Sequence, residues 1–172
     1  MNLYPSTTTL RGFIAYEFST LRARARRSQL WAKLVGVKAT LAVFPRKDAR
    51  LTPSRELIGI QNIRVDQIVG TLNRDTDFDH LFRPLNKHSL DRWVNAYILQ
   101  AQDGWAPILV HKVDEQYFVE DGHHRVSVAR VTGMDFIEAK VWEHGTQKKN
   151  TDMCQPAIYC TKKSSARGYA TH

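Results

Sequence analysis

Apolar residues recur along this chain at two different spacings, which predict where helices and strands form. Over residues 16–35 they recur about once per helical turn, which predicts an amphipathic helix. A second apolar stripe predicts a helix from Ser89, a good N-cap residue, to about Gln102. The apolar positions are Phe18, Leu21, Ala25, Trp31 and Leu34 in the first stripe, and Leu90, Trp93, Val94, Tyr97, Ile98 and Ala101 in the second.

Four segments are rich in β-branched and aromatic side chains and predict strands. They cover residues 59–69, 107–113, 117–120 and 136–143. The turn 114–116 joins the middle two as a hairpin, and a short helix is expected at 123–131, ending at Gly133. The residues before the first helix are expected to be loosely structured, and residues 37–53 to form a connector. The order of these elements predicts a compact α+β domain.

Charge divides the chain into three parts. Residues 1–50 carry ten Lys/Arg and two Asp/Glu, residues 51–144 carry ten and fourteen, and residues 145–172 carry five and one. The formal net charge of +8 therefore comes from the two ends, because the middle is mildly acidic. We expect a basic N-terminal helix and connector at 1–55, a globular domain at 56–144, and a polar, disordered tail at 145–172.

Composition excludes several classes of protein. At 172 residues and 42% hydrophobic, the chain can bury one core of ordinary size. No apolar run has the length of a membrane span, and the N-terminus lacks the pattern of a signal peptide. The two cysteines, Cys154 and Cys160, are too few for a disulfide framework. A cytoplasmic location is therefore expected.

The segment Asp121-Gly122-His123-His124-Arg125 lies between a strand-like and a helix-like run. A glycine there allows a tight turn, and the helix that follows presents free N–H groups and the positive end of its dipole. With two histidines and an arginine added, the turn predicts a phosphate-binding site. Either histidine is a candidate general acid or base near neutral pH. The alternative is a structural junction in which Asp121 caps the helix.

Four carboxylates in this region are candidate ligands for a magnesium ion held mainly by phosphates. They are Asp75, Asp77, Asp79 and Asp121. The alternative for the first three is helix capping and solvation. A site in which the protein alone holds a metal ion is not expected, because adjacent histidines point in different directions and no His-x-x-x-His spacing occurs.

Three other arginines, Arg74, Arg83 and Arg130, are interpreted from their positions in the sequence. Arg74 and Arg83 flank the acidic loop, where they are candidates to close over a phosphate. Arg130 comes about one and a half helical turns after the motif, so we expect it to be solvated.

Basic residues occupy the polar positions of the first predicted helix, at Arg22, Arg24, Arg26 and Arg27. A basic amphipathic helix can lie on nucleic acid, a membrane surface or an acidic partner, or it can pack on the core with a solvated outer face. We predict contact between these four arginines and DNA phosphates, without reading of the base sequence.

Several segments together resemble the ParB/sulfiredoxin superfamily over about residues 60–143. The similarity is greatest to small bacterial ParB-like proteins with an Asp-Gly-His-His-Arg motif and a basic N-terminal helix. This resemblance implies the fold of the small ParB N-terminal α+β domain. The matching segments are Ile68-Val69-Gly70-Thr71, Asp77-Phe78-Asp79, Phe82-Arg83-Pro84, Arg92-Trp93, Pro107-Ile108 and residues 117–130.

The resemblance also implies a ligand. ParB proteins hold the phosphates of CTP with a Gly-x-Arg-Arg motif, sulfiredoxins use Gly-Cys-His-Arg, and ADP-dependent free serine kinases use Asp-Gly-His-Thr-Arg. Sulfiredoxin chemistry is not carried over, because His123 stands where sulfiredoxin has its reactive cysteine. Kinase activity is not carried over either, because the catalytic glutamate has no assigned counterpart. The phosphate-binding residues implied are Thr71, Arg74, Asp121, Gly122, His123, His124 and Arg125.

The sequence thus predicts a domain that binds CTP, ATP or ADP, with magnesium as a candidate companion ion, and that couples nucleotide binding or hydrolysis to DNA association. Two alternatives remain open at this stage. One is a DNA-binding regulator without nucleotide turnover, and the other is a small-molecule phosphotransferase related to the free serine kinases.

Overall fold

The computed structural model describes residues 7–102 and 104–146 of the 172-residue chain. Helices and strands both contribute, so the predicted α+β class is confirmed. In chain order the elements are α1 (Thr7–Val35), β1 (Ala42–Val43), β2 (Leu51–Arg64), the 3-10 helix η1 (Val65–Gln67), β3 (Ile68–Thr71), the 3-10 helix η2 (Lys87–Ser89), α2 (Leu90–Gln102), β4 (Ile108–Val113), β5 (Gln116–Asp121), α3 (His123–Val131) and β6 (Phe136–Thr146).

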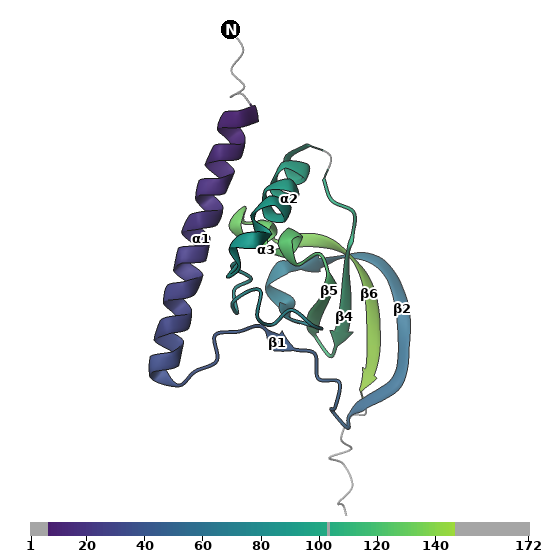
Figure 1. Cartoon of the computed structure of the whole chain (residues 1–172). Helices are drawn as coiled ribbons and strands as arrows, with labels where there is room; N and C mark the ends of the chain where they lie inside the picture. Colours follow the sequence, from purple (N-terminus) through teal and green to yellow (C-terminus); the bar gives the residue numbers. More distant parts are fainter. Residues whose placement is uncertain (1–6, 103, 147–172) are drawn as a thin grey trace, which may run out of the picture.

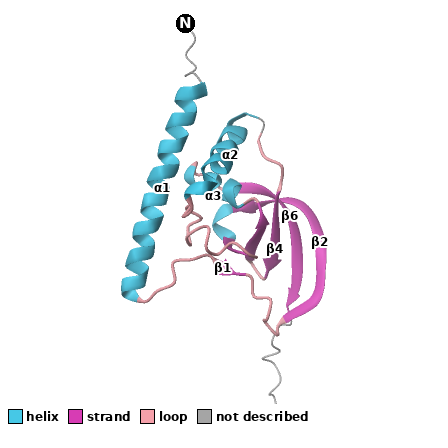
Figure 2. Cartoon of the chain, in the orientation of Figure 1, coloured by secondary structure: helices cyan, strands magenta, loops and turns pink. Residues whose placement is uncertain are grey.

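The strands form one curled, mixed sheet in the order β1-β3-β5-β4-β6-β2 (Figure 2). β3 pairs with β5 in parallel, with Thr71 opposite Val119. The carboxyl ends of parallel neighbours meet at the same edge of a sheet. The loop after β3 and the turn after β5 therefore leave the sheet side by side, and this edge carries the candidate site.

The helices lie on one side of the sheet, with α2 and α3 between it and α1 (Figure 1). Ile14, Phe18 and Leu21 of α1 pack into a buried cluster with α2 and α3. At its centre Trp93 is fully buried, with its ring 5.7 Å from that of Phe18, and its Nε1 donates to Ser127 Oγ at 2.9 Å. The apolar stripe of α1 is therefore built into the core of the domain between Ile14 and Leu21.

A second cluster fills the space between the inner sheet face and α3. Alternate residues of β4 and β6 point into it, which is the period-two pattern of a sheet covered on one face. These residues pack on Val126 and Ala129 of α3. The sheet-side members include Ile68, Ile108, Val110, Val119, Ala139 and Val141, all fully buried. The apolar contacts between these strand residues and Val126 and Ala129 thus hold α3 against the sheet.

Several predicted boundaries are wrong. α1 begins at Thr7, nine residues before its predicted start at residue 16. The strand expected at 59–69 is two strands that lie far apart in the sheet, with β2 at one edge and β3 next to the strand at the other edge. They are separated by η1, next to which Arg64 and Asp66 form a local ion pair at 2.6 Å. The connector expected at 37–53 contains β1 and the start of β2, which runs through residues 55 and 56.

Two further corrections concern element ends. Ser89 belongs to η2, where its hydroxyl donates to the Asn86 carbonyl at 2.7 Å instead of accepting from the first turn of α2. β6 continues to Thr146, three residues past its predicted end and into the expected tail. The rest of that tail, with Cys154 and Cys160, lies outside the described residues. Among the described helices, none has the length and apolar character needed to cross a bilayer.

Candidate functional site

Gly122 makes the turn from β5 into α3. Its φ of +103° is in the left-handed region, and a Cβ there would lie 2.5 Å from Cγ2 of Ile108. Only glycine satisfies both conditions. The first helical hydrogen bond runs from the Val126 N–H to the Gly122 carbonyl at 3.0 Å. The N–H groups of residues 123–125 therefore begin the helix without carbonyl partners within it, as a helix N-terminus requires.

Arg125 is held by protein groups on three sides. One guanidinium nitrogen donates to the carbonyls of Ala106 and Pro107 at 2.5 and 3.2 Å, and the other donates to the Asp121 carboxylate at 2.5 Å. The guanidinium thus ties the first turn of α3 to the segment that leads into β4. Asp121 does not cap the helix, since its carboxylate is paired with Arg125 and no side-chain cap bond forms at the N-terminus of α3.

His123 is buried and hydrogen-bonded to the end of β3, with its Nε2 2.7 Å from Thr71 Oγ1. The Thr71 oxygen also accepts the backbone N–H groups of Asn73 and Arg74 at 3.2 and 3.1 Å. With both lone pairs used, the hydroxyl proton is left for the histidine. This count assigns His123 as a neutral ring with its proton on Nδ1.

Both motif histidines are neutral at neutral pH. Burial, and after it the charge of Arg74, lowers the pKa of His123 to about 4. Burial, and then the charges of Arg92 and Arg74, lowers the pKa of His124 to about 4. Neither ring therefore carries the proton that a general acid needs near pH 7. Phe78 lies beside both rings, with centroids 5.8 Å from His123 and 5.3 Å from His124.

These shifts predict that acid destabilises the fold before the carboxylates titrate. The folded-state pKa of each histidine lies below the unfolded value of 6.5, so the unfolded chain binds more protons. Stability is complete above pH 6.5 and falls toward pH 4, by up to about 1.4 kcal/mol per pH unit for each histidine. Urea unfolding at several pH values between 7 and 5 would measure this slope. His123→Gln should flatten it, and an unchanged slope in that variant would contradict the burial argument.

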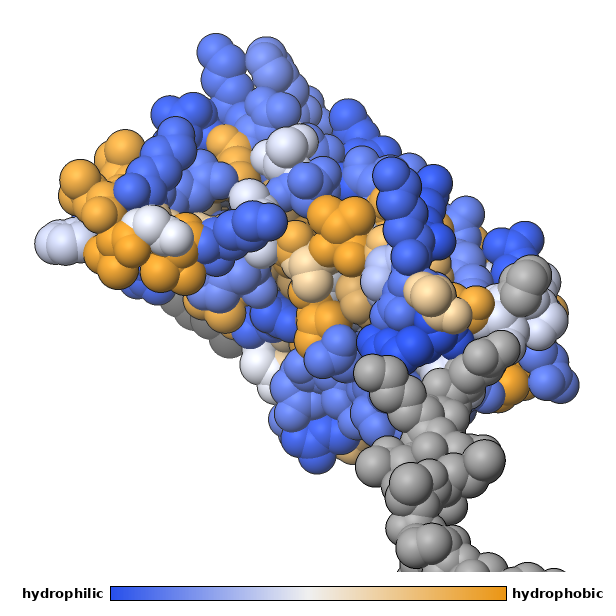
Figure 3. Space-filling model, turned by 90° about the horizontal axis from the view of Figure 1, so that it is seen from below, coloured by the Kyte–Doolittle hydropathy of each residue, from blue (hydrophilic) through white to orange (hydrophobic). Residues whose placement is uncertain are grey.

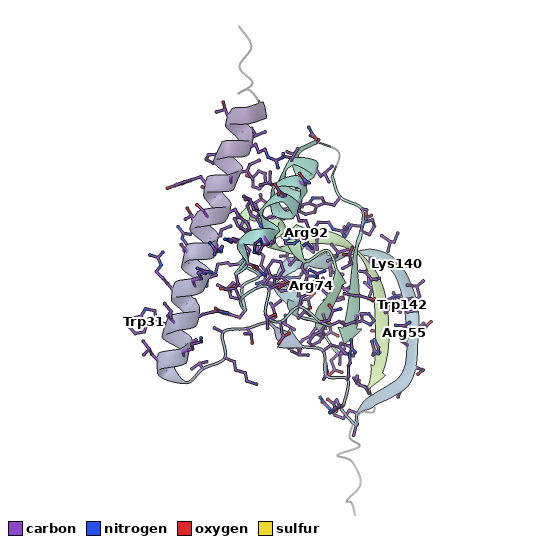
Figure 4. The ribbon with its side chains drawn as sticks, in the orientation of Figure 1. Trp31, Arg55, Arg74, Arg92, Lys140 and Trp142 are labelled. Carbon is purple, nitrogen blue, oxygen red and sulfur yellow. The ribbon has the colours of Figure 1, made fainter. Side chains whose placement is uncertain are left out.

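The turn opens onto a cavity of about 300 Å³. Two guanidinium groups reach it from outside the motif: Arg74 from the loop after β3 and Arg92 from the first turn of α2 (Figure 4). Within the described part of the chain, the Arg92 guanidinium forms no hydrogen bond or ion pair, and the Arg74 guanidinium forms only a 3.4 Å ion pair with Asp77. Nδ1 of His124, which also lines the cavity, is buried without a partner among the described residues. The cavity is therefore positively charged, and several of its polar groups have no hydrogen-bond partner among the described residues.

The structure brings together most of the predicted phosphate-binding residues. Arg74, Asp121, Gly122, His123, His124 and Arg125 line the cavity, and Thr71 supports it through His123. Sequence reasoning missed Arg92 and Asn95 of α2, which also line it. The available signal was their spacing of three residues, which places both on one polar face of the predicted helix.

The side chains of Asp79 and Arg83 bind each other, and neither lines the cavity. Asp79 is fully buried, and its carboxylate accepts the N–H groups of Leu81 and Arg83 at 3.0 and 2.9 Å and pairs with the Arg83 guanidinium at 2.6 Å. These bonds occupy the groups that the sequence offered for magnesium and for a phosphate. Among the described residues, no three His, Cys, Asp or Glu side chains are placed to hold a metal ion.

Arg130 is not solvated, which corrects the sequence-based expectation. Its guanidinium donates to the Ile68 carbonyl at 2.7 Å and lies 4.9 Å above the ring of Phe82. Burial lowers the pKa of this arginine. The side chain therefore joins α3 to the start of β3 instead of extending into solvent.

The four arginines predicted to contact DNA differ in their surroundings. Nε of Arg22 donates to the Leu85 carbonyl at 3.0 Å, which fixes α1 to the segment before α2. Arg24, Arg26 and Arg27 are exposed, and they have no hydrogen bond or ion pair with the residues that the structure describes. Contact between this surface and DNA stays a prediction.

Comparison with solved structures finds partial matches, among them a sulfiredoxin and a ParB protein. Sulfiredoxin from Arabidopsis thaliana has 23% sequence identity and a TM-score of 0.37, over 48% of this chain and 82% of the other. The C-terminally truncated chromosome-partitioning protein ParB from Caulobacter crescentus, complexed with CTP-γ-S, has 16% identity and a TM-score of 0.37, over 49% of this chain and 44% of the other. No protein-family model and no curated protein sequence matches the chain. The chain is thus similar, over about half its length, to a sulfiredoxin and to a ParB protein.

Proposed function

We propose that this protein binds the phosphate groups of a nucleoside di- or triphosphate in the cavity at the N-terminus of α3. The observation that carries the proposal is the meeting of three anion-binding features in one cavity: a helix N-terminus and the side chains of Arg74 and Arg92. The neutral state of His123 and His124 makes the two arginines the main positive charges there.

The other walls of the cavity suit the remainder of a nucleotide. Ala96, Leu99 and Trp105 add an apolar surface, and the Asn95 side chain can donate and accept hydrogen bonds. A nucleotide has the matching composition, since it joins a flat, largely apolar base to an anionic chain. The motif resemblance supports the same ligand class, because the superfamily places nucleotide phosphates at this turn.

Arg125 has a positioning part in this proposal. Its nitrogens are engaged by Ala106, Pro107 and Asp121, so it holds the turn in the shape that exposes the helix N-terminus. Three of its five N–H donors are used in these bonds, whereas the Arg92 guanidinium forms no hydrogen bond with the described residues. Arg92 is therefore the sharper residue for a test.

Arg92→Ala should weaken binding of the preferred nucleotide about tenfold or more, because one charge-assisted contact is lost. Calorimetric titration with CTP, ATP and ADP, each with and without magnesium, would measure the affinities and name the base. Arg46→Ala removes an exposed arginine that does not line this cavity and should bind as the wild type does. Absence of binding to all three nucleotides, or equal affinity in Arg92→Ala, would leave the turn as a structural junction.

A further inference from the structure

The end of α1 exposes a group of large apolar side chains. In Figure 3, which views the molecule from below, an orange cluster lies at the left, on the side of α1. Single exposed apolar residues are ordinary, but a contiguous group on one element marks a surface that something covers. We call this group the apolar tip. It comprises Leu30, Trp31, Leu34 and Val35 of α1, together with Val37 just after it, and these side chains are between 62% and 79% exposed.

Cations surround the apolar tip without acidic residues to balance them. No Asp or Glu occurs from residue 18 to residue 47 of the sequence. We call the nearby exposed cations the basic collar. It comprises Arg24, Arg26, Arg27, Lys33 and Lys38, and none of these has a hydrogen bond or ion pair with the described residues. An anionic partner would therefore meet free positive charge on this surface.

The apolar tip covers a wide arc of the helix. At 100° per residue, Leu30, Trp31, Leu34 and Val35 span about 140° of its circumference. Ile14, Phe18 and Leu21, which pack on the domain, belong to the other end of the helix. The last two turns of α1 thus present a broad apolar face with basic residues beside and behind it. A helix that lies in a lipid interface has this composition, with Trp and Leu on one face and Lys or Arg around them.

Two other occupants fit less well. DNA phosphates would neutralise the basic collar but would leave the apolar tip in water. A second copy of the chain would cover the apolar tip, but a symmetric contact would also bring two basic collars together with no acid between them. A surface that offers negative charge and an apolar interior satisfies both parts at once.

We propose that the apolar tip and the basic collar bind membranes that contain anionic lipids. Trp31, Leu30 and Leu34 insert among the acyl chains near the headgroups, and the basic collar contacts the lipid phosphates. The domain stays outside the bilayer, since α1 lies on the interface and does not cross it. This surface shares no residue with the nucleotide cavity, so its test is independent of the proposed function.

Sedimentation with lipid vesicles tests the proposal on the 172-residue chain. We expect it to sediment with phosphatidylcholine vesicles that contain phosphatidylglycerol, to stay in solution with phosphatidylcholine alone, and to be released as salt rises. Tryptophan emission should shift to shorter wavelength on binding. Trp31→Phe should abolish that shift, because the other three tryptophans pack on the domain: Trp93 is fully buried, and Trp105 and Trp142 are partly buried.

Two variants separate the apolar and the charged parts. Leu30→Ser with Leu34→Ser should reduce vesicle affinity at least tenfold by removing the inserted apolar surface. Arg24→Glu with Arg27→Glu should reduce it by about fivefold or more for each charge. Leu57→Ser with Ile60→Ser is the matched control, because these residues are similarly exposed but lie on β2, and it should bind vesicles as the wild type does.

Three outcomes would overturn the proposal. The first is no sedimentation with anionic vesicles. The second is unchanged vesicle binding in the Leu30→Ser, Leu34→Ser variant. The third is association without lipid: either binding to duplex DNA or a dimer in light scattering, with no vesicle binding, would assign the surface to that partner instead.

Discussion

Asp79→Ala should lower the free energy of unfolding by about 3–5 kcal/mol, the largest loss expected from a single substitution among those considered. The Asp79 carboxylate is fully buried and satisfies two backbone N–H groups and the Arg83 guanidinium. Removing it leaves a largely buried positive charge and two N–H groups without acceptors. The loop 72–86, which carries Arg74, would lose the contact that organises it.

Urea unfolding followed by circular dichroism would measure this loss. Asp79→Asn keeps an acceptor oxygen without the charge, so its loss should be intermediate. Asp66→Ala removes one partner of the exposed Arg64–Asp66 pair, and its stability should match the wild type. Equal stabilities of Asp79→Ala and Asp66→Ala would show that the buried network contributes little.

Gly122→Ala should destabilise the fold by about 2–4 kcal/mol and should also abolish nucleotide binding. The left-handed φ of +103° strains any residue with a Cβ by about 1–3 kcal/mol, and the overlap with Ile108 adds an overpacking cost of similar size. Relief of the overlap requires the first turn of α3 to move away from β4. That movement displaces the N–H groups of residues 123–125 from the cavity.

Gly133→Ala separates the two costs in this experiment. Gly133 also has a positive φ, +70°, but nothing lies within 4 Å of the position of its Cβ. It should show the backbone strain alone and should keep nucleotide affinity. If both variants unfold at the same urea concentration, the contact with Ile108 does not constrain the turn.

The apolar periodicity of the sequence predicts those helices and strands whose ends are marked by nearby residues. α2, the hairpin of β4 and β5, and α3 all lie close to their predicted ranges, because periodicity and the glycines at 104 and 133 mark them. The division of 59–69 into β2 and β3 was missed, because no Gly or Pro interrupts the apolar pattern between residues 60 and 69 and the turn at η1 depends on sheet pairing. Trp31 and Leu34 were assigned to the packed stripe, yet they are 69% and 79% exposed.

The candidate site is also predicted only in part from the sequence. The turn at Gly122 follows from the motif itself, and the residues around it were named from sequence. The protonation and the hydrogen bonds of those residues are not predictable from the motif, because they depend on residues far along the chain. Thr71 is 52 residues from His123, and Ala106 is 19 residues from Arg125. Burial keeps the two histidines neutral near pH 7, and no local pattern reports that burial.

The Thr71 hydroxyl limits which sequences can share this site. One oxygen accepts two backbone N–H groups and donates its only proton to His123. Serine offers the same donor and acceptors at the same distance from the backbone, whereas valine has the shape of threonine and none of its hydrogen bonds. Replacement of His123 by a residue that can only donate would leave that proton without an acceptor. Positions 71 and 123 are therefore coupled: natural variation at one is expected to be accompanied by change at the other, although 52 residues separate them.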